Sequence, residues 1–396
     1  MNKKPKSDID IANTTVRLRK VYFISGFDPR GAAYYHRLYK EEAKKQSVLN
    51  CIDIEVGARR KIASHQYQWA IKSVINQQCV NTEYSYLGWD DIVREHWETN
   101  GAKLIGQTAK GYWRFTACGA LGRIRKLYRG PFYSGIYPIL FLFIAILISL
   151  IFGGLLADLL IATSFPFLVV GAVCLASMFA CYYLAWKIAD YIGVLWLLRT
   201  NLFVYFWGES TPNKLSERVE IFAKKIVNEQ IKSPYDEIIL IGHSVGSIVA
   251  VSVLARALAL SAEKLNLSLV TLGQCIPVLS LIPSAASFRQ DLKTLALQLN
   301  IPWLDVVARA DPLCFAEVNP ISVSGIDSPS VQWPKQQIMR PFKMFSPQQY
   351  NRIKRNKLRL HFQYLMSSEY QTDYDFFLLT AGSVRLNVDK SSNHSF

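Results

Sequence analysis

Residues 237–254 read EIILIGHSVGSIVAVSVL, and this stretch decides the expected fold. The β-branched and apolar run that follows Glu237 is typical of a buried strand, and the apolar spacing after Gly246 is typical of a helix. Between them, Gly242-His243-Ser244-Val245-Gly246 fits the pattern Gly-x-Ser-x-Gly, a turn so tight that neither glycine position accepts a bulky side chain. We therefore expect a strand, a sharp turn with Ser244 at its tip, and a helix whose N-terminal amides face the serine oxygen.

A five-residue pattern occurs by chance, but its place between a strand and a helix favours a nucleophilic serine. On these residues the chain resembles the α/β-hydrolase superfamily, the lipases and esterases especially. The resemblance covers two blocks, about Arg19–Gly57 and Tyr235–Tyr364. It implies an α/β fold with a mostly parallel sheet flanked by helices, the nucleophile Ser244, and an elbow formed by Gly242, His243 and Gly246.

The resemblance also implies two backbone amides that hold an oxyanion. One is the amide of Val245, directly after the nucleophile, and the other is the amide of Phe27, which follows a predicted strand over 21–25 and Gly26. Ser25 stands where many members of the superfamily carry His. The alternative is that Gly26 only ends an ordinary strand.

Members of the superfamily carry their triad in the order Ser, acid, His. His361 and His394 are the histidines late enough in the chain, and His394 lies in the terminal residues, which we expect to be too mobile to hold an imidazole in place. We therefore predict His361 as the base. Asp311 follows a predicted strand over 302–308 and is the predicted acid, because Asp305 lies in the middle of that strand. This chemistry requires no metal and no organic cofactor.

Composition limits the partners. The chain has 396 residues, of which 51% are hydrophobic and 19% charged, so most of it is expected to fold around a core. The net charge of +15 favours an anionic partner, either a membrane surface or nucleic acid, but no nucleic-acid-binding motif is present. The seven cysteines show no metal-ligand spacing and no disulfide framework, which favours a reducing compartment.

Residues 131–186 contain a single charged residue, Asp158. Pro138–Ala157 and Leu159–Trp186 are each long enough for the ~20 residues that cross a bilayer, with the turn expected from Gly153 to Asp158. Basic residues flank the pair on both sides and are missing from the turn, which predicts a multi-pass protein of the membrane, the bacterial inner membrane in our interpretation, with both termini and the hydrolase core in the cytoplasm. The alternative is a buried core hairpin or an apolar lid. Residues 191–207 suit an interfacial or a core helix.

The chain therefore divides into five expected parts. These are a flexible N-terminus (1–17), the N-terminal part of the hydrolase core (18–130), the membrane hairpin with an interfacial segment (131–200), the C-terminal part of the core with the elbow and a lid (201–380), and a flexible tail (381–396). Further strands are predicted over 49–57 and 267–273, and helices over 32–46 and 212–231. Residues 66–130 suggest no function.

The expected function is hydrolysis of carboxylic esters, of lipids in particular, because a core tied to a bilayer meets lipids at high local concentration. A basic cluster before His361 is a candidate for anionic headgroups or an ordinary solvated helix face; it consists of Arg352, Lys354, Arg355, Lys357 and Arg359. An acyltransferase or thioesterase with the same triad, and a non-catalytic scaffold, are the alternatives.

Overall fold

The computed structural model describes residues 15–231, 234–326 and 332–386. Most of the two ends expected to be flexible, 1–17 and 381–396, lies outside the described residues, and so does His394. The described parts of these ends lie against each other, because the Val16 amide donates to the Ser383 carbonyl at 2.8 Å.

The chain forms an α/β structure around a mixed, mostly parallel sheet of nine strands in the part of the chain that is described. The strand order is β2-β4-β5-β1-β6-β7-β8-β9, and β3 pairs with β4. Strands β5, β1, β6, β7, β8 and β9 are parallel to one another, whereas β4 is antiparallel to β5, β2 and β3. The strands are β1 (Leu18–Ile24), β2 (Asp53–Val56), β3 (Arg60–Ala63), β4 (Gln66–Ile75), β5 (Gln78–Leu87), β6 (Glu237–His243), β7 (Ser268–Leu272), β8 (Trp303–Val307) and β9 (Lys335–Ile338).

The strand predicted over 49–57 forms as the shorter β2, and it does not pair with β1. β2 lies at the edge of the sheet, antiparallel to β4, and β5 takes the position beside β1. Residues 66–87, which show no clear pattern in the sequence, form the β4–β5 hairpin that supplies this neighbour. Burial alternates along β4 from Trp69 to Val74, but the polar Ser73 lies on the buried face and the apolar Val74 on the exposed face, so the apolar residues do not alternate regularly.

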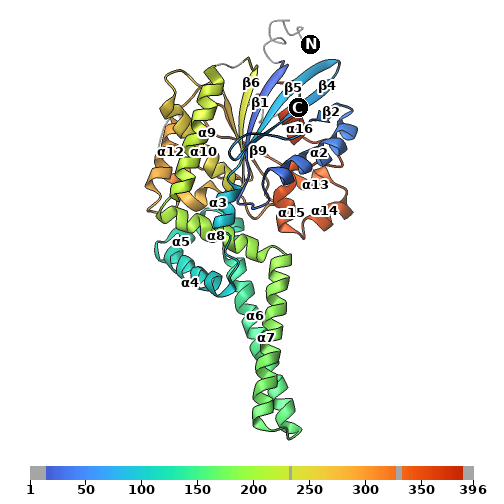
Figure 1. The fold of residues 1–396 in the computed structure, drawn as a ribbon, viewed down its shortest axis with the longest axis vertical. Helices are drawn as coiled ribbons and strands as arrows, with labels where there is room; N and C mark the ends of the chain where they lie inside the picture. The colour runs from blue at the N-terminus through green and yellow to red at the C-terminus, as the bar shows by residue number, and fades with distance from the viewer. Residues whose placement is uncertain (1–14, 232–233, 327–331, 387–396) are drawn as a thin grey trace, which may run out of the picture.

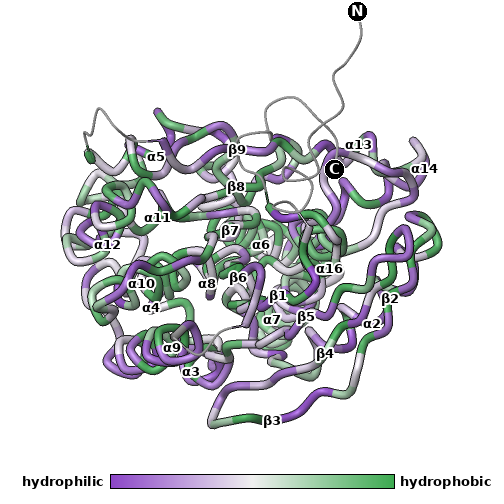
Figure 2. Tube along the Cα trace, turned by 90° about the horizontal axis from the view of Figure 1, so that it is seen from above, coloured by the Kyte–Doolittle hydropathy of each residue, from purple (hydrophilic) through white to green (hydrophobic). Residues whose placement is uncertain are grey.

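Helices cover both faces of the sheet (Figure 1). One face carries α9 (Asn213–Ile231), α10 (Val245–Leu260) and α12 (Ala286–Ala296), and the other carries α2 (Gly31–Asn50) and α16 (Phe376–Ala381), as the view from above also shows (Figure 2). Apart from α6 and α7, the other helices are α3 (Asp90–Glu95), α4 (Gly101–Ala117), α5 (Ala120–Leu127), α8 (Val194–Glu209), α11 (Ile276–Ser280), α13 (Pro341–Met344), α14 (Pro347–Ile353), α15 (Lys357–His361), η1 (Ser322–Ser324) and η2 (Phe362–Leu365). The core therefore lies between the two helical layers and the sheet.

Two apolar helices leave this core as a long antiparallel hairpin, drawn in green in Figure 1. They are α6 (Arg129–Ala162) and α7 (Phe167–Tyr191), and both are long and apolar enough to cross a membrane. At 1.5 Å per residue, the 34 residues of α6 extend about 51 Å. Many large apolar side chains on the hairpin are exposed, among them Leu147, Leu168, Leu175 and Phe179.

The turn of the hairpin lies at residues 163–166, so the prediction of a turn from Gly153 to Asp158 is wrong. Gly153 lies inside α6 and faces α7, where an added Cβ would overlap Met178. The glycine therefore allows close helix packing, and the chain reverses only at Ser164, whose φ is +60°, before Pro166. After the hairpin, α8 buries ten of its residues and is a core helix.

Candidate functional site

Ser244 lies at the tip of a strained turn between β6 and α10. Its φ of 56° and ψ of −126° are unusual for a residue with a side chain, and the conformation projects the side chain away from the sheet. A Cβ on Gly242 would lie 2.5 Å from the Gly246 carbonyl oxygen, and a Cβ on Gly246 would overlap the carbonyl oxygens that end β1. The two glycines therefore permit the turn for the steric reason that the sequence indicates.

The loop after β1 lies directly beside Ser244. A Cβ on Gly26 would lie 3.0 Å from the Ser244 Cβ, so only a bare backbone fits there. β1 and β6 are neighbours in the sheet. The strands β2 to β5 lie on the β1 side of this pair, and the strands β7 to β9 lie on the β6 side. This reversal is a topological switch point, where α/β sheets open a crevice at the carboxyl ends of their strands.

Asp311 and His361, which are 50 residues apart in sequence, meet in the interior. The His361 Nδ1 donates to the Asp311 Oδ2 at 2.7 Å, and both side chains are almost fully buried. Asp311 follows β8 by four residues, and His361 ends α15. Burial alone would raise the pKa of Asp311, but the His361 imidazole and further donors lower it below 3.8, so the carboxyl is ionised near neutral pH.

His361 and Ser244 are not joined by a hydrogen bond. The Nε2 atom of His361 is buried and has no hydrogen-bond partner among the described residues. With Nδ1 protonated toward Asp311, this Nε2 carries a lone pair that can accept a proton. The structure therefore brings the predicted acid and base together and leaves the base atom unpaired.

His243, the other histidine of the site, connects the elbow to His361. Its ring centroid is 5.0 Å from that of His361, and its Nε2 donates to the His361 carbonyl at 3.1 Å. Burial is the main cause that lowers the pKa of His243 to about 3, so this ring is neutral. A neutral His243 therefore anchors the backbone of the predicted base beside Ser244.

Sequence reasoning missed the residues that orient Asp311. The Tyr364 hydroxyl donates to Asp311 Oδ2 at 3.0 Å, and the Leu313 amide donates to Oδ1 at 3.0 Å. Tyr364 follows His361 by three residues, which places both on one side of a helical turn, and this spacing is the signal that could have identified it. Gly273, with φ +56°, leaves the space that the Tyr364 ring fills.

The two segments that carry the predicted oxyanion amides both adjoin Ser244, since Val245 follows it directly and Gly26, the residue before Phe27, lies against it. Val245 begins α10, so its amide has no acceptor within the helix. The backbone around Phe27 is fixed by two indoles: Trp89 Nε1 donates to the Ser25 carbonyl at 2.9 Å, and Trp196 Nε1 donates to the Phe27 carbonyl at 3.1 Å. The loop that carries the Phe27 amide is therefore held from both ends.

The base of the apolar hairpin and the adjoining α8 contact the segments that carry three predicted site residues, Phe27, Asp311 and His361. Trp196, which contacts Phe27, lies in α8 directly after the hairpin. Ser134 in α6 donates to the carbonyl of Pro312, the residue after Asp311, at 2.8 Å. A Cβ on Gly193, between α7 and α8, would lie 3.5 Å from a methyl group of Leu358 in the helix of His361. The hairpin and the candidate site therefore share one end of the molecule (Figure 1).

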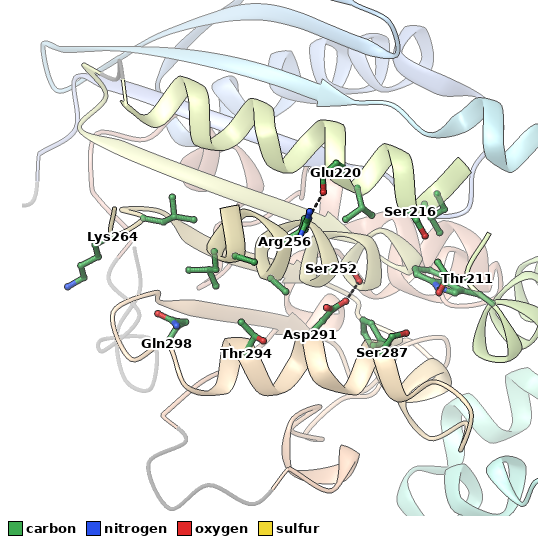
Figure 3. Close-up of a pocket in the computed structure, with 18 of the residues that line it drawn as sticks. Thr211, Ser216, Glu220, Ser252, Arg256, Lys264, Ser287, Asp291, Thr294 and Gln298 are labelled. Atoms are coloured by element: carbon green, nitrogen blue, oxygen red, sulfur yellow. Dashed lines mark hydrogen bonds and ion pairs between the residues drawn. The ribbon is translucent and has the colours of Figure 1, made fainter. Parts of the chain in front are cut away.

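A groove of about 770 Å³ lies elsewhere, between α9, α10 and α12 (Figure 3). Asp291 accepts a hydrogen bond from Ser252 at 2.7 Å within it, and Glu220 pairs with Arg256 at its rim. None of the predicted site residues lines this groove.

Among the described residues, no group of three or more His, Cys, Asp or Glu side chains is arranged to hold a metal ion. No protein-family model, curated protein or solved structure matches the chain.

Proposed function

We propose that this chain is a serine hydrolase of carboxylic esters. The observation that carries the proposal is the buried hydrogen bond between Asp311 and His361, which leaves the His361 Nε2 unpaired at the sheet edge where Ser244 occupies a strained elbow. A serine hydroxyl is a weak nucleophile at neutral pH and needs such an oriented base.

In the proposed reaction, the Ser244 Oγ attacks the ester carbonyl carbon while the His361 Nε2 takes the hydroxyl proton. The amides of Val245 and Phe27 stabilise the negative charge on the carbonyl oxygen, and His361 gives the proton to the departing alcohol. Water then attacks the acyl group on Ser244 by the same route, which releases the carboxylic acid. Rotation of the Ser244 side chain toward Nε2 begins the cycle, because no hydrogen bond joins the two in the resting structure.

We further propose that α6 and α7 anchor the enzyme in a membrane and that its substrates are lipids. The hairpin exposes apolar side chains along its length and leaves the core at the end that carries the candidate site. Substrate esters within the same bilayer would be presented to Ser244 at high effective concentration.

A fluorophosphonate probe, which reacts covalently with activated serines, tests the proposal on the full chain in detergent micelles. We expect labelling of the wild type and loss of labelling in Ser244→Ala and His361→Ala. Ser252→Ala is the matched control, because Ser252 lies in α10 but away from the site, and it should label like the wild type. A folded wild type that the probe does not label contradicts the proposed hydrolase activity.

Release of free fatty acid from a lipid ester identifies water as the acyl acceptor and distinguishes hydrolysis from acyl transfer.

A further inference from the structure

A cation is fixed beside the candidate site in a cage of aromatic rings. Arg30 lies on the loop that carries Gly26 and Phe27, six residues after the end of β1. Its guanidinium carbon is 3.6 Å from the ring centroid of Tyr34, 4.8 Å from that of Trp196 and 4.9 Å from that of Phe362. The three rings belong to α2, α8 and η2, so distant parts of the chain converge on this side chain.

One edge of the Arg30 guanidinium donates hydrogen bonds to Asp28, and the other edge does not. Asp28, which is 2% exposed, accepts Nε at 2.8 Å and Nη2 at 2.6 Å, and it also accepts the Tyr35 hydroxyl at 2.8 Å. The Arg30 side chain remains 34% exposed, and its Nη1 takes no part in the hydrogen bonds to Asp28. The carboxylate and the rings therefore fix the plane of the guanidinium and leave one donor edge accessible to solvent.

The cage adjoins the predicted triad. Phe362 directly follows His361, and its ring centroid is 5.3 Å from that of His243 in the elbow. Trp196 donates to the carbonyl of Phe27, the residue predicted to supply an oxyanion amide. A ligand at the open edge of Arg30 would thus lie next to the place where the proposed function puts the scissile ester.

We propose that Arg30 binds the phosphate of a glycerophospholipid while one of the lipid's acyl esters is presented to Ser244. This inference rests on the proposed function and names its substrate class. A guanidinium edge held in one plane donates two directed hydrogen bonds to a phosphate, a group that a diacylglycerol lacks. Asp28 offsets much of the long-range charge of Arg30, so recognition here depends on directed donors at short range.

The test compares two lipids with the same acyl chains, dioleoylphosphatidylglycerol and dioleoylglycerol, in micelles of a neutral detergent with the full-length chain. The readout is the ratio of kcat/KM for the two lipids. We expect the wild type to prefer the phospholipid by about tenfold or more, the size of a charge-assisted contact. Arg30→Gln should lower this ratio about tenfold, and Arg30→Lys should lie between the two.

Arg37→Gln is the matched control, since Arg37 lies on α2, is 69% exposed and pairs with Glu41. It should retain the wild-type ratio. Because Arg30→Gln alone leaves the buried Asp28 carboxylate unpaired, the double variant Asp28→Asn/Arg30→Gln should be measured as well. Fluorophosphonate labelling reports whether each variant is folded, and if neither Gln variant labels, the ratio of Arg30→Lys decides.

Three outcomes would overturn the inference. The first is a wild type that hydrolyses both lipids equally well, and the second is a labelled Arg30 variant that keeps the full wild-type preference. The third is inhibition of dioleoylglycerol hydrolysis by inorganic phosphate at constant ionic strength without any preference between the lipids, since this would assign Arg30 to a free anion. In each case labelling of Ser244 leaves the proposed function standing, whereas a wild type that neither labels nor hydrolyses either lipid removes the proposed function itself.

Discussion

Asp311 in the core and Asp291 in the groove beside α10 are two carboxyls whose pKa values shift in opposite directions. Burial raises the pKa of both, but Asp311 gains the His361 imidazole, the Leu313 amide and the Tyr364 hydroxyl as donors, and its pKa falls below 3.8. Asp291 has the Ser252 hydroxyl alone, and its pKa rises to about 6. The attraction of the His361 imidazole, together with the donors, therefore outweighs burial at Asp311, whereas burial outweighs the single donor at Asp291.

Asp291→Asn is predicted to stabilise the protein at alkaline pH. A folded pKa of about 6, above the usual 3.8, means that protonation favours the folded state. The stability of the wild type rises as pH falls from about 6 to about 4, and above pH 6 the ionised Asp291 is a cost. The amide removes that cost, so we expect a gain of about 1–2 kcal/mol at pH 8, discounted for the partial exposure of the site, and little gain at pH 4.

Unfolding in detergent micelles at the two pH values measures this gain. Glu220→Gln, on the rim of the same groove, is the control and should change stability by less than about 0.5 kcal/mol, because its pair with Arg256 is exposed. An Asp291→Asn variant that is less stable than the wild type at pH 8 would show that Ser252 and other contacts outweigh the charge.

Single residues of the candidate site differ in how far the sequence reveals them. Ser244 is identifiable because its turn imposes a local glycine pattern. Asp311 and His361 required the chain order of a family, and the structure brings them into contact while their catalytic roles remain predictions. Tyr364 is indicated only by its spacing from His361, and Arg30 has no local pattern, because Trp196 and Phe362 come from other elements and only the folded chain places them around it.

At the scale of elements, the base of the hairpin and α8 are predicted to position the oxyanion loop. Trp196→Phe keeps an aromatic ring against Arg30 but removes the N–H that holds the Phe27 carbonyl. A loosened loop weakens stabilisation of the transition state more than binding of the substrate, so kcat should fall about tenfold with KM nearly unchanged.

Hydrolysis of one soluble ester by the purified variants tests this. Trp186→Phe, at the end of α7, is the matched control and should retain the wild-type kcat, because the Trp186 indole makes no hydrogen bond to the loop. A Trp196→Phe variant with an unchanged kcat would mean that Trp89 alone is sufficient to fix the loop.

The elements that the sequence indicates well are those with one strong local pattern. The buried strands around 237–243, 268–272 and 303–307 and the helices α9 and α10 are continuous apolar or amphipathic runs. The β4–β5 hairpin was missed because polar residues such as Ser73 and Thr82 occupy buried positions in it, and the turn of the long hairpin was misplaced because Gly153 is a packing residue. In both cases a neighbouring element determines the structure, and the local composition does not.

At the scale of the whole molecule, the parallel strands β1 and β6 direct their carboxyl ends toward the hairpin, so the candidate site and the apolar helices lie at one end (Figure 1). The insertion separates the two halves of the core in sequence, yet β1 and β6 are adjacent in the sheet. A hairpin permits this, because it returns the chain to the side from which it left.

The proposed anchoring makes a prediction about sidedness. If α6 and α7 span a membrane, the turn at 163–166 lies on the side opposite to the core, and the excess of Lys and Arg near the base places the core in the cytoplasm. The test uses two variants with a single cysteine each. One carries Ser164→Cys in a chain without the native cysteines, and it should react with a membrane-impermeant maleimide in intact cells or spheroplasts. The other keeps only the native Cys79, exposed on β5 of the core, and it should react only after the membrane is opened. Equal reactivity of the two positions before lysis would mean that the hairpin does not span, since only a spanning hairpin separates its turn from the core by a bilayer.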